Sequence, residues 1–144
     1  MSRIINLNSP AKIRNRNRRT IAEILRRMST KSEFDDESRD MSATIVFLLR
    51  EIHSGVIVSV EAWEKRGYWM KADRFIREWE WTIDTASNLE DVIRNDAWDL
   101  LPRLLGEMYP HTAGIELKKL TRPPSTWEGA YGRLMDEPPS ESPW

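Results

Sequence analysis

Hydrophobic residues recur at helical spacing along most of this chain, and three long apolar stripes dominate the pattern. The first stripe comprises Ile13, Ile21, Ile24, Leu25 and Met28. These positions fall on one side of a helix that advances about 100° per residue. Ser9 and Pro10 precede the stripe, and a serine N-cap followed by proline at the first position is a typical helix start. The sequence therefore predicts a helix from Ser9 to about Met28.

A second and longer stripe begins after the acidic run 35–37, which suits the positive end of a helix dipole. Its members are Met41, Ile45, Leu48, Leu49, Ile52, Val56, Ser59, Val60 and Trp63. The stripe keeps its phase through Gly55, so we predict one helix to about Arg66, although glycine costs about 1 kcal/mol inside a helix. The competing interpretation is a break at Ser54 and Gly55, with 56–58 as a β-rich run.

The stripe loses its phase at 65–67, and a third stripe follows. It comprises Trp69, Ala72, Phe75, Ile76, Trp79, Ile83, Ala86, Leu89 and Ile93. Two long helices joined at Gly67 predict an antiparallel hairpin. Asn95 and Asp96 end the second of these helices.

Shorter elements are expected after the hairpin. Asp99 is the predicted N-cap of a helix from Leu100 to Met108, which Tyr109 and Pro110 would end. Residues 115–120 partly alternate in polarity and are expected to be extended, and a last helix is expected from Thr126 to Met135. One face of that helix carries apolar side chains, which suit a lid on the core of the same chain or a tether to a neighbouring chain. They are Trp127, Tyr131, Leu134 and Met135.

These elements define an all-α fold with a long antiparallel helical hairpin. The basic first helix and the two shorter C-terminal helices are expected to pack around that hairpin. The predicted organisation is an extended arm at 1–8, a single helical domain at 9–136 and a mobile tail, rich in proline and serine, at 137–144. A chain of 144 residues suits one domain.

Charge is distributed unevenly along the chain. Residues 1–32 hold nine basic residues and one acidic residue, whereas the whole chain has a formal net charge of −1. The cations that ring the first helix are Lys12, Arg14, Arg16, Arg18 and Arg19. They suit contact with an anionic partner such as RNA, DNA, an acidic protein or a membrane surface. The competing interpretation is that they pair with the acidic body of this chain or of a partner subunit.

Trp81 lies off the apolar stripe that contains Trp79, projecting roughly 180° from it. On that side its neighbours are Met70, Arg74 and Arg77. An outward tryptophan among arginines suggests an interface anchor or a platform for a stacked base. The alternative is a helix that other helices cover on both faces.

The second long helix also has a smaller apolar patch, which includes Phe47 and Val58. Two helices with apolar residues on both sides predict a homo-oligomer, because such surfaces are normally covered.

Residues typical of enzyme sites are sparse. The chain has no cysteine and only two histidines, His53 and His111. Glu107 and His111 share the spacing of a helical metal pair, but Pro110 interrupts it. Glycine-rich phosphate loops and nucleophile elbows are absent from the sequence. We therefore expect no catalytic site, metal or cofactor.

Localisation follows weakly from the same composition. The sequence has no apolar run near the roughly 20 residues of a membrane span and no secretory signal pattern. It therefore predicts a cytoplasmic protein without a transmembrane segment. The start of the chain, rich in arginine and poor in acids, also resembles a transit peptide, but the capped helix favours a permanent element.

Four segments together resemble one protein family. They are 6–10 (Asn-Leu-Asn-Ser-Pro), 19–23 (Arg-Thr-Ile-Ala-Glu), 62–66 (Ala-Trp-Glu-Lys-Arg) and 79–81 (Trp-Glu-Trp). In these segments the chain resembles a family of small uncharacterised proteins from green non-sulfur (Chloroflexota) bacteria. The resemblance implies a bacterial cytoplasmic protein and brings no activity or site residue with it.

The residues themselves then favour a non-enzymatic interaction or scaffold protein that associates with its own copies. Trp81 and the patch at Phe47 and Val58 would form its contacts. The alternative is an accessory protein that binds RNA or DNA through the basic first helix.

Overall fold

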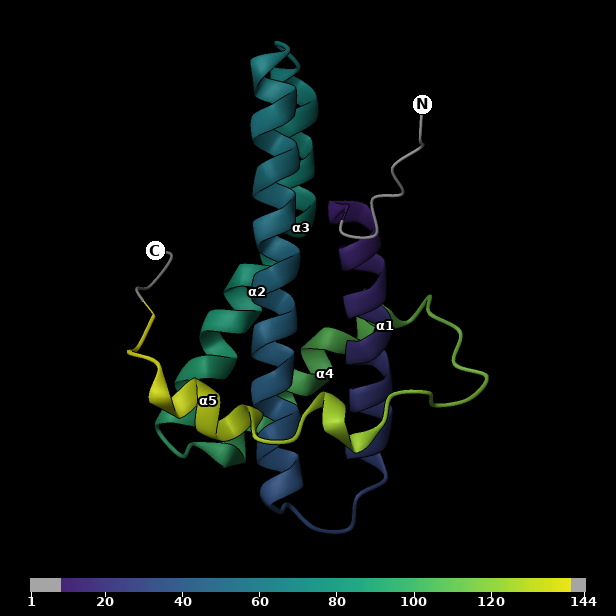
Figure 1. Ribbon diagram of the computed structural model, residues 1–144, viewed down its shortest axis with the longest axis vertical. Coiled ribbons are helices and arrows are strands. Elements are labelled where there is room, and N and C mark those ends of the chain that lie inside the picture. The colour runs from purple at the N-terminus through teal and green to yellow at the C-terminus, as the bar shows by residue number, and fades with distance from the viewer. Residues whose placement is uncertain (1–8, 141–144) are drawn as a thin grey trace, which may run out of the picture.

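The computed structural model describes residues 9–140, which fold into five α-helices and two short 3₁₀ helices without a β-strand. The α-helices are α1 (Pro10–Ser29), α2 (Asp36–Lys65), α3 (Trp69–Arg94), α4 (Leu101–Thr112) and α5 (Ala130–Asp136). The 3₁₀ helices are η1 (Trp98–Leu100) and η2 (Pro124–Thr126). Figure 1 shows α2 and α3 as a long antiparallel pair with the other helices around its lower part. The all-α prediction is confirmed, and the predicted arm at 1–8 lies outside the described residues.

The starts of α1 and α2 are capped by side chains. The Ser9 hydroxyl accepts a hydrogen bond from the backbone N–H of Lys12 at 3.3 Å. The Asp35 carboxylate accepts one from the backbone N–H of Ser38 at 3.0 Å, and the Ser38 hydroxyl accepts one from the N–H of Asp35 in return. Both caps hold donors that the first turn of a helix leaves without partners. The first of these two helix starts was predicted at the correct residue.

The helix α2 is unbroken through Gly55, so the predicted single helix is confirmed and the β-rich alternative is wrong. The glycine has a packing role, because a Cβ at this position would lie 3.2 Å from the Cβ of Pro10. The first residue of α1 therefore packs directly against the middle of α2. The chain reverses at Gly67, whose φ of +80° favours glycine over other residues.

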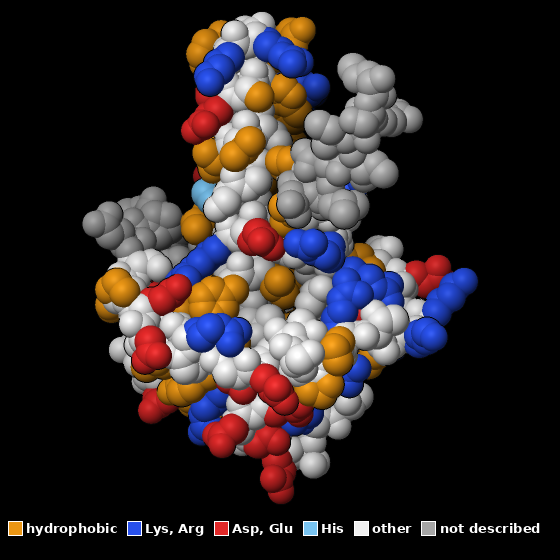
Figure 2. Space-filling view, viewed as in Figure 1, with side chains coloured by type: hydrophobic (Ala, Val, Ile, Leu, Met, Phe, Trp, Pro, Cys, Tyr) orange, Lys and Arg blue, Asp and Glu red, His pale blue; other side chains and the backbone are white. Residues whose placement is uncertain are grey.

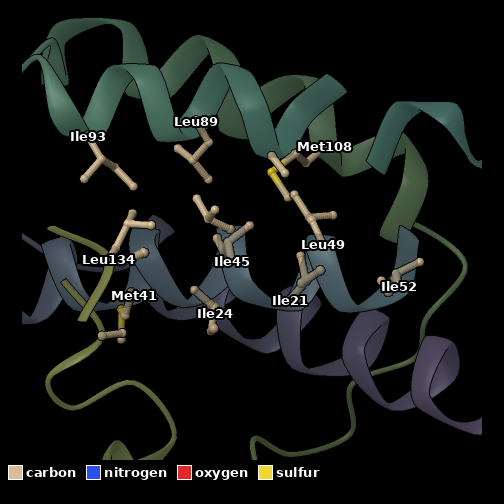
Figure 3. Close-up of a cluster of buried hydrophobic side chains, with 14 of the residues drawn as sticks. Ile21, Ile24, Met41, Ile45, Leu49, Ile52, Leu89, Ile93, Met108 and Leu134 are labelled. Atoms are coloured by element: carbon tan, nitrogen blue, oxygen red, sulfur yellow. The ribbon is translucent and has the colours of Figure 1, made fainter. Parts of the chain in front are cut away.

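The core lies where α1, α2 and α3 meet α4 and α5 (Figure 3). Its largest member is Trp127, most of the others are buried aliphatic side chains, and α2 contributes to most of the contacts between helices. Those labelled in Figure 3 are Ile21, Ile24, Met41, Ile45, Leu49, Ile52, Leu89, Ile93, Met108 and Leu134. The predicted stripes supply most of this core, which reaches up the hairpin as far as Val60 and Ala72. The prediction is wrong at Trp69, which begins the third stripe but is 63% exposed.

Both ends of α4 depart from the prediction. Asp99 lies within η1 and does not cap a helix, since α4 begins at Leu101 with no side-chain cap. The helix does not end at Pro110 but continues to Thr112. A proline so near the end of a helix forfeits little backbone hydrogen bonding, and Arg18 from α1 donates to the carbonyl of His111 at 2.7 Å. A partner 93 residues away thus supports a helix end that local sequence cannot reveal.

Beyond α4 the chain is irregular as far as η2. Residues 115–120, which we expected to be extended, form neither a helix nor a strand. The last α-helix begins at Ala130 rather than Thr126, where η2 ends. Trp127 is buried, and its indole N–H donates to Glu37 at 3.1 Å. The apolar face of this C-terminal segment therefore closes the core of its own chain.

One helix, α2, is long and apolar enough to cross a membrane by length and composition alone. Within its most apolar stretch, 44% of the residues are buried inside the protein. This helix also contacts α1, α3 and α5. These contacts explain its apolar composition as that of a central core helix.

Candidate functional site

Three of the five predicted cations on α1 are half-buried against partners within their own chain. The guanidinium of Arg14 lies over the rings of Phe75 and Trp79, at 5.2 and 5.1 Å from their centroids. Arg18 donates to the His111 carbonyl and lies 5.8 Å from the Trp79 ring. Arg19 contacts the Glu23 carboxylate at 3.3 Å. These contacts turn the three cations toward their own chain, but the only carboxylate among these partners is Glu23, which lies on the same helix.

The other two predicted cations remain on the surface. Lys12 and Arg16 are exposed, and Arg16 lies 3.9 Å from the equally exposed Glu51. An exposed pair of this kind contributes little to stability. Nucleic-acid binding by the first helix stays a prediction, and it now depends on these two side chains.

The indole of Trp81 has a partner in α4. It stacks on the imidazole of His111 with centroids 3.8 Å apart and planes inclined by 7°. Burial, together with the positive charge of Arg18, lowers the pKa of His111 below its ordinary value. Trp81 is half-buried rather than fully outward, as in the alternative that a second layer covers α3. Sequence reasoning missed the stack because α4 was expected to end at Pro110.

Arg14, Arg18, Trp79, Trp81 and His111 thus form one cation–aromatic joint between α1, α3 and α4. Two of its donors, the Nε of Arg18 and the indole N–H of Trp79, are buried without a hydrogen-bond partner among the described residues. The joint therefore brings together Arg14 and Arg18, predicted to bind an anionic partner, and Trp81, predicted to lie in a protein interface. Its contacts hold three helices in place.

The far end of the hairpin has a different character. We call residues 56–77 the distal hairpin, because α1 begins beside Gly55 and this part rises above the other helices in Figure 1. Val58 and Met70, two of the predicted interface residues, have 57% and 78% of their surface exposed. Tyr68 and Trp69 are exposed at 52% and 63%. Figure 2 shows apolar and basic side chains gathered at this end.

The remaining predicted interface residues are dispersed. Arg74 is exposed, and Arg77 is exposed with its guanidinium 3.2 Å from the Asp73 carboxylate. Phe47 lies on the body, half-buried beneath the guanidinium of Arg50 at 5.6 Å. The structure therefore does not unite the predicted interface in one patch. It places Val58, Met70, Arg74 and Arg77 on the distal hairpin, Trp81 in the joint and Phe47 on the body.

Two buried carboxylates were not singled out as sites from the sequence. Glu23 is fully buried and accepts hydrogen bonds from the backbone N–H groups of Thr121 and Arg122, at 2.6 and 2.9 Å. Burial alone would raise its pKa, but these backbone hydrogen bonds outweigh burial and lower it. The spacing of Arg19, Glu23 and Arg27 at four-residue intervals suits ion pairs on both sides of Glu23. The pair with Arg19 is present, whereas Arg27 donates to the carbonyl of Arg122.

Glu90 is the second buried carboxylate, and it lies between Arg50 and Arg94, each 2.6 Å away. Burial opposes its ionisation, yet hydrogen bonds from Arg94, Ser140 and Arg50 lower its pKa to about 2. Arg50 also contacts Glu137 at 3.0 Å. Residues 137–140, expected to be mobile, are thus fastened to α2 and α3. Both carboxylates secure connecting segments.

Residues 9–140 contain no group of three or more His, Cys, Asp or Glu side chains that could hold a metal ion. No family model, curated protein or solved structure matches this chain. The bacterial family suggested by the four sequence segments is therefore not identified by these comparisons. The chain is a small all-helical protein of 144 residues.

Proposed function

We propose that this chain is a non-enzymatic interaction protein that associates with copies of itself through the sides of its distal hairpin. The observation that carries the proposal is the exposure of Val58, Arg74 and Arg77 on a pair of helices that extends past α1. Two helices bury only the faces that they turn toward each other. Apolar side chains elsewhere on the pair are covered when a further helix packs there.

Charge on the distal hairpin also supports self-association. The α2 part (56–65) has two acidic residues and one lysine, a net charge of −1, whereas the α3 part (69–77) has three cations and one aspartate, a net charge of +2. In a two-fold symmetric dimer the same patch serves both copies. Packing α2 of one copy against α3 of the other then sets acidic side chains opposite basic ones.

We also propose that the chain belongs to the family of small helical bacterial proteins that its sequence resembles. This assignment is supported by the four segments that carry the resemblance, and it adds no activity. Enzyme function and cofactor binding are not proposed.

Light scattering on the purified chain tests self-association. A dimer gives twice the 16.9 kDa of one chain, and Val58→Asp is expected to shift the mass toward one chain by placing a charge in the apolar contact. Leu100→Asp is the matched control, since Leu100 is similarly exposed at 50% but lies on the body. A mass of one chain for the unmodified protein at millimolar concentration contradicts the proposal.

A further inference from the structure

The end of the hairpin has a composition of its own, which self-association does not require. We call residues 65–71 the hairpin tip; its sequence is Lys-Arg-Gly-Tyr-Trp-Met-Lys. Every residue of the tip is exposed, and Met70 has the largest exposed fraction among the exposed large hydrophobic residues. The tip thus combines three large apolar or aromatic side chains with three cations and no acid.

Local helix stability does not explain these residues. Tyr68, at the N-cap of α3, makes no side-chain cap hydrogen bond, and the first turn of α3 contains no acidic residue. Helix starts are normally stabilised by Ser, Thr, Asp or Asn caps and by nearby acids. Here Lys71 lies near the positive end of the helix dipole instead. Departures from local stability rules are typical of functional positions.

The three cations are free of ionic partners in residues 9–140. No carboxylate there lies within salt-bridge distance of Lys65, Arg66 or Lys71. The ammonium of Lys71 lies 4.5 Å from the centre of the Trp63 ring, which still leaves its charge uncompensated. The tip therefore presents net positive charge around an exposed apolar centre.

This combination fits the surface of a lipid bilayer. Tryptophan and tyrosine favour the depth of the headgroups, where one end of the ring is apolar and the other is wet. Lysine and arginine reach anionic headgroups while their aliphatic stems stay in the apolar layer. A nucleic acid would use the cations and the rings but gives Met70 no apolar environment.

The shape of the molecule fits the same partner. The tip lies at the extreme end of the hairpin, beyond the body in Figures 1 and 2. A projecting end can touch a flat surface without steric conflict from the rest of the protein. From the exposed apolar centre, the unpaired cations and this position, we infer that the hairpin tip docks on the surface of anionic lipid bilayers.

Sedimentation of the full chain with lipid vesicles tests the inference. We expect binding to vesicles of phosphatidylcholine mixed with phosphatidylglycerol, weak binding to phosphatidylcholine alone and weakening by salt. The triple variant Lys65→Gln, Arg66→Gln and Lys71→Gln should weaken binding to the anionic vesicles roughly 100-fold, given the usual contribution of each cation. The double variant Trp69→Ser and Met70→Ser should weaken binding to the same vesicles by removing the apolar centre.

A matched control removes three exposed cations from the body instead. Arg103→Gln, Lys118→Gln and Lys119→Gln give the same change in net charge, and this variant should bind anionic vesicles like the unmodified chain. An equal loss in the control would show that only net charge matters and would overturn the inference. Failure of the unmodified chain to bind anionic vesicles would overturn it as well.

Light scattering without lipid separates this inference from the proposed function. The tip variants should keep the mass of the unmodified chain, whereas Val58→Asp lowers it. If the tip variants dissociate the oligomer and the unmodified chain does not bind vesicles, the tip is a contact between copies. Docking on lipid would then be rejected. A monomeric chain that still binds anionic vesicles through the tip would reject self-association alone.

Discussion

The lower and upper parts of the hairpin use the same two helices in opposite ways. In the body, α2 packs against α1, α3 and α5, and residues such as Ile45 and Leu49 are fully buried. In the distal hairpin Val60 and Ala72 are still buried, but Trp69 and Met70 are exposed. A helix pair buries a complete core only where further helices cover it. The difference shows that two continuous helices can support a core along one part and expose large apolar side chains along another.

The largest expected difference between the two parts concerns apolar truncations on α2. Leu49→Ala should lower the free energy of unfolding by about 2–5 kcal/mol, because it leaves a cavity in the body. Val58→Ala, on the same helix but exposed, should change it by about 0.5 kcal/mol or less. Urea denaturation of both variants measures the contrast. Equal losses would mean that the distal hairpin is as tightly packed as the body.

A smaller effect concerns pH and the buried ion pairs of the body. Glu90 has its pKa lowered from 4.5 to about 2 in the folded chain. A lowered pKa stabilises the folded state above the unfolded value, and this contribution is lost as pH falls from about 4.5 toward 2. Its size is about 3 kcal/mol, given 1.36 kcal/mol per pKa unit.

Unfolding free energies between pH 6 and 2 would test this effect. Glu90→Gln should show a smaller decline in this range, because its amide cannot titrate. Some decline should persist, since the pKa values of Glu23 and Glu37 are lowered too. A variant that declines as steeply as the unmodified chain would contradict the assignment to Glu90.

Backbone conformation at the turn gives an effect near 1 kcal/mol. Gly67→Ala should destabilise the chain by about 1 kcal/mol, because the φ of +80° strains any residue with a Cβ. The Cβ itself would meet nothing within 4 Å. Gly106→Ala is the matched control, since Gly106 lies within α4 with equally open surroundings. That change should stabilise the chain by up to about 1 kcal/mol, and thermal melting distinguishes the two signs.

The smallest effect is expected at the tip. Trp69→Ser should alter the melting temperature very little, because about two thirds of this side chain is already exposed, at 63%. Trp127→Ser, which empties a buried site on the body, should melt far earlier. A large loss for Trp69→Ser would show that the tip packs against its own chain, and the distal hairpin would cease to be a free surface.

Helical periodicity was enough to predict the fold class, the long hairpin and its reversal at Gly67. The apolar stripe that continues through Gly55 correctly predicted that α2 is one helix. Helical spacing over many residues is a stronger signal than the low helix propensity of a single glycine. Elements after Asp96 were predicted less well. The end of α4 depends on Arg18, and the start of α5 follows η2, so local residues alone could not place either boundary.

The candidate sites were harder to predict than the helices. Val58 and Met70 were expected to be exposed and are, but Trp81 stacks on a residue 30 positions away that no periodicity connects to it. The contacts of Arg14 and Arg18 also depend on which aromatic rings of α3 face α1. Such pairings are set by how helices dock. The run of basic and aromatic residues at 65–71 is visible in the sequence. This segment predicted the reversal at Gly67, but the run was not identified as one exposed surface.

The contact between Pro10 and Gly55 also sets how far the hairpin reaches. α1 starts where the ring of Pro10 meets the bare backbone of Gly55, so this contact fixes the height at which three-helix packing stops. Inserting one helical turn into both α2 and α3, beyond the buried Val60 and Ala72, would move the tip by about 5.4 Å while leaving the core in place. The reach of the protein is therefore adjustable independently of its folding.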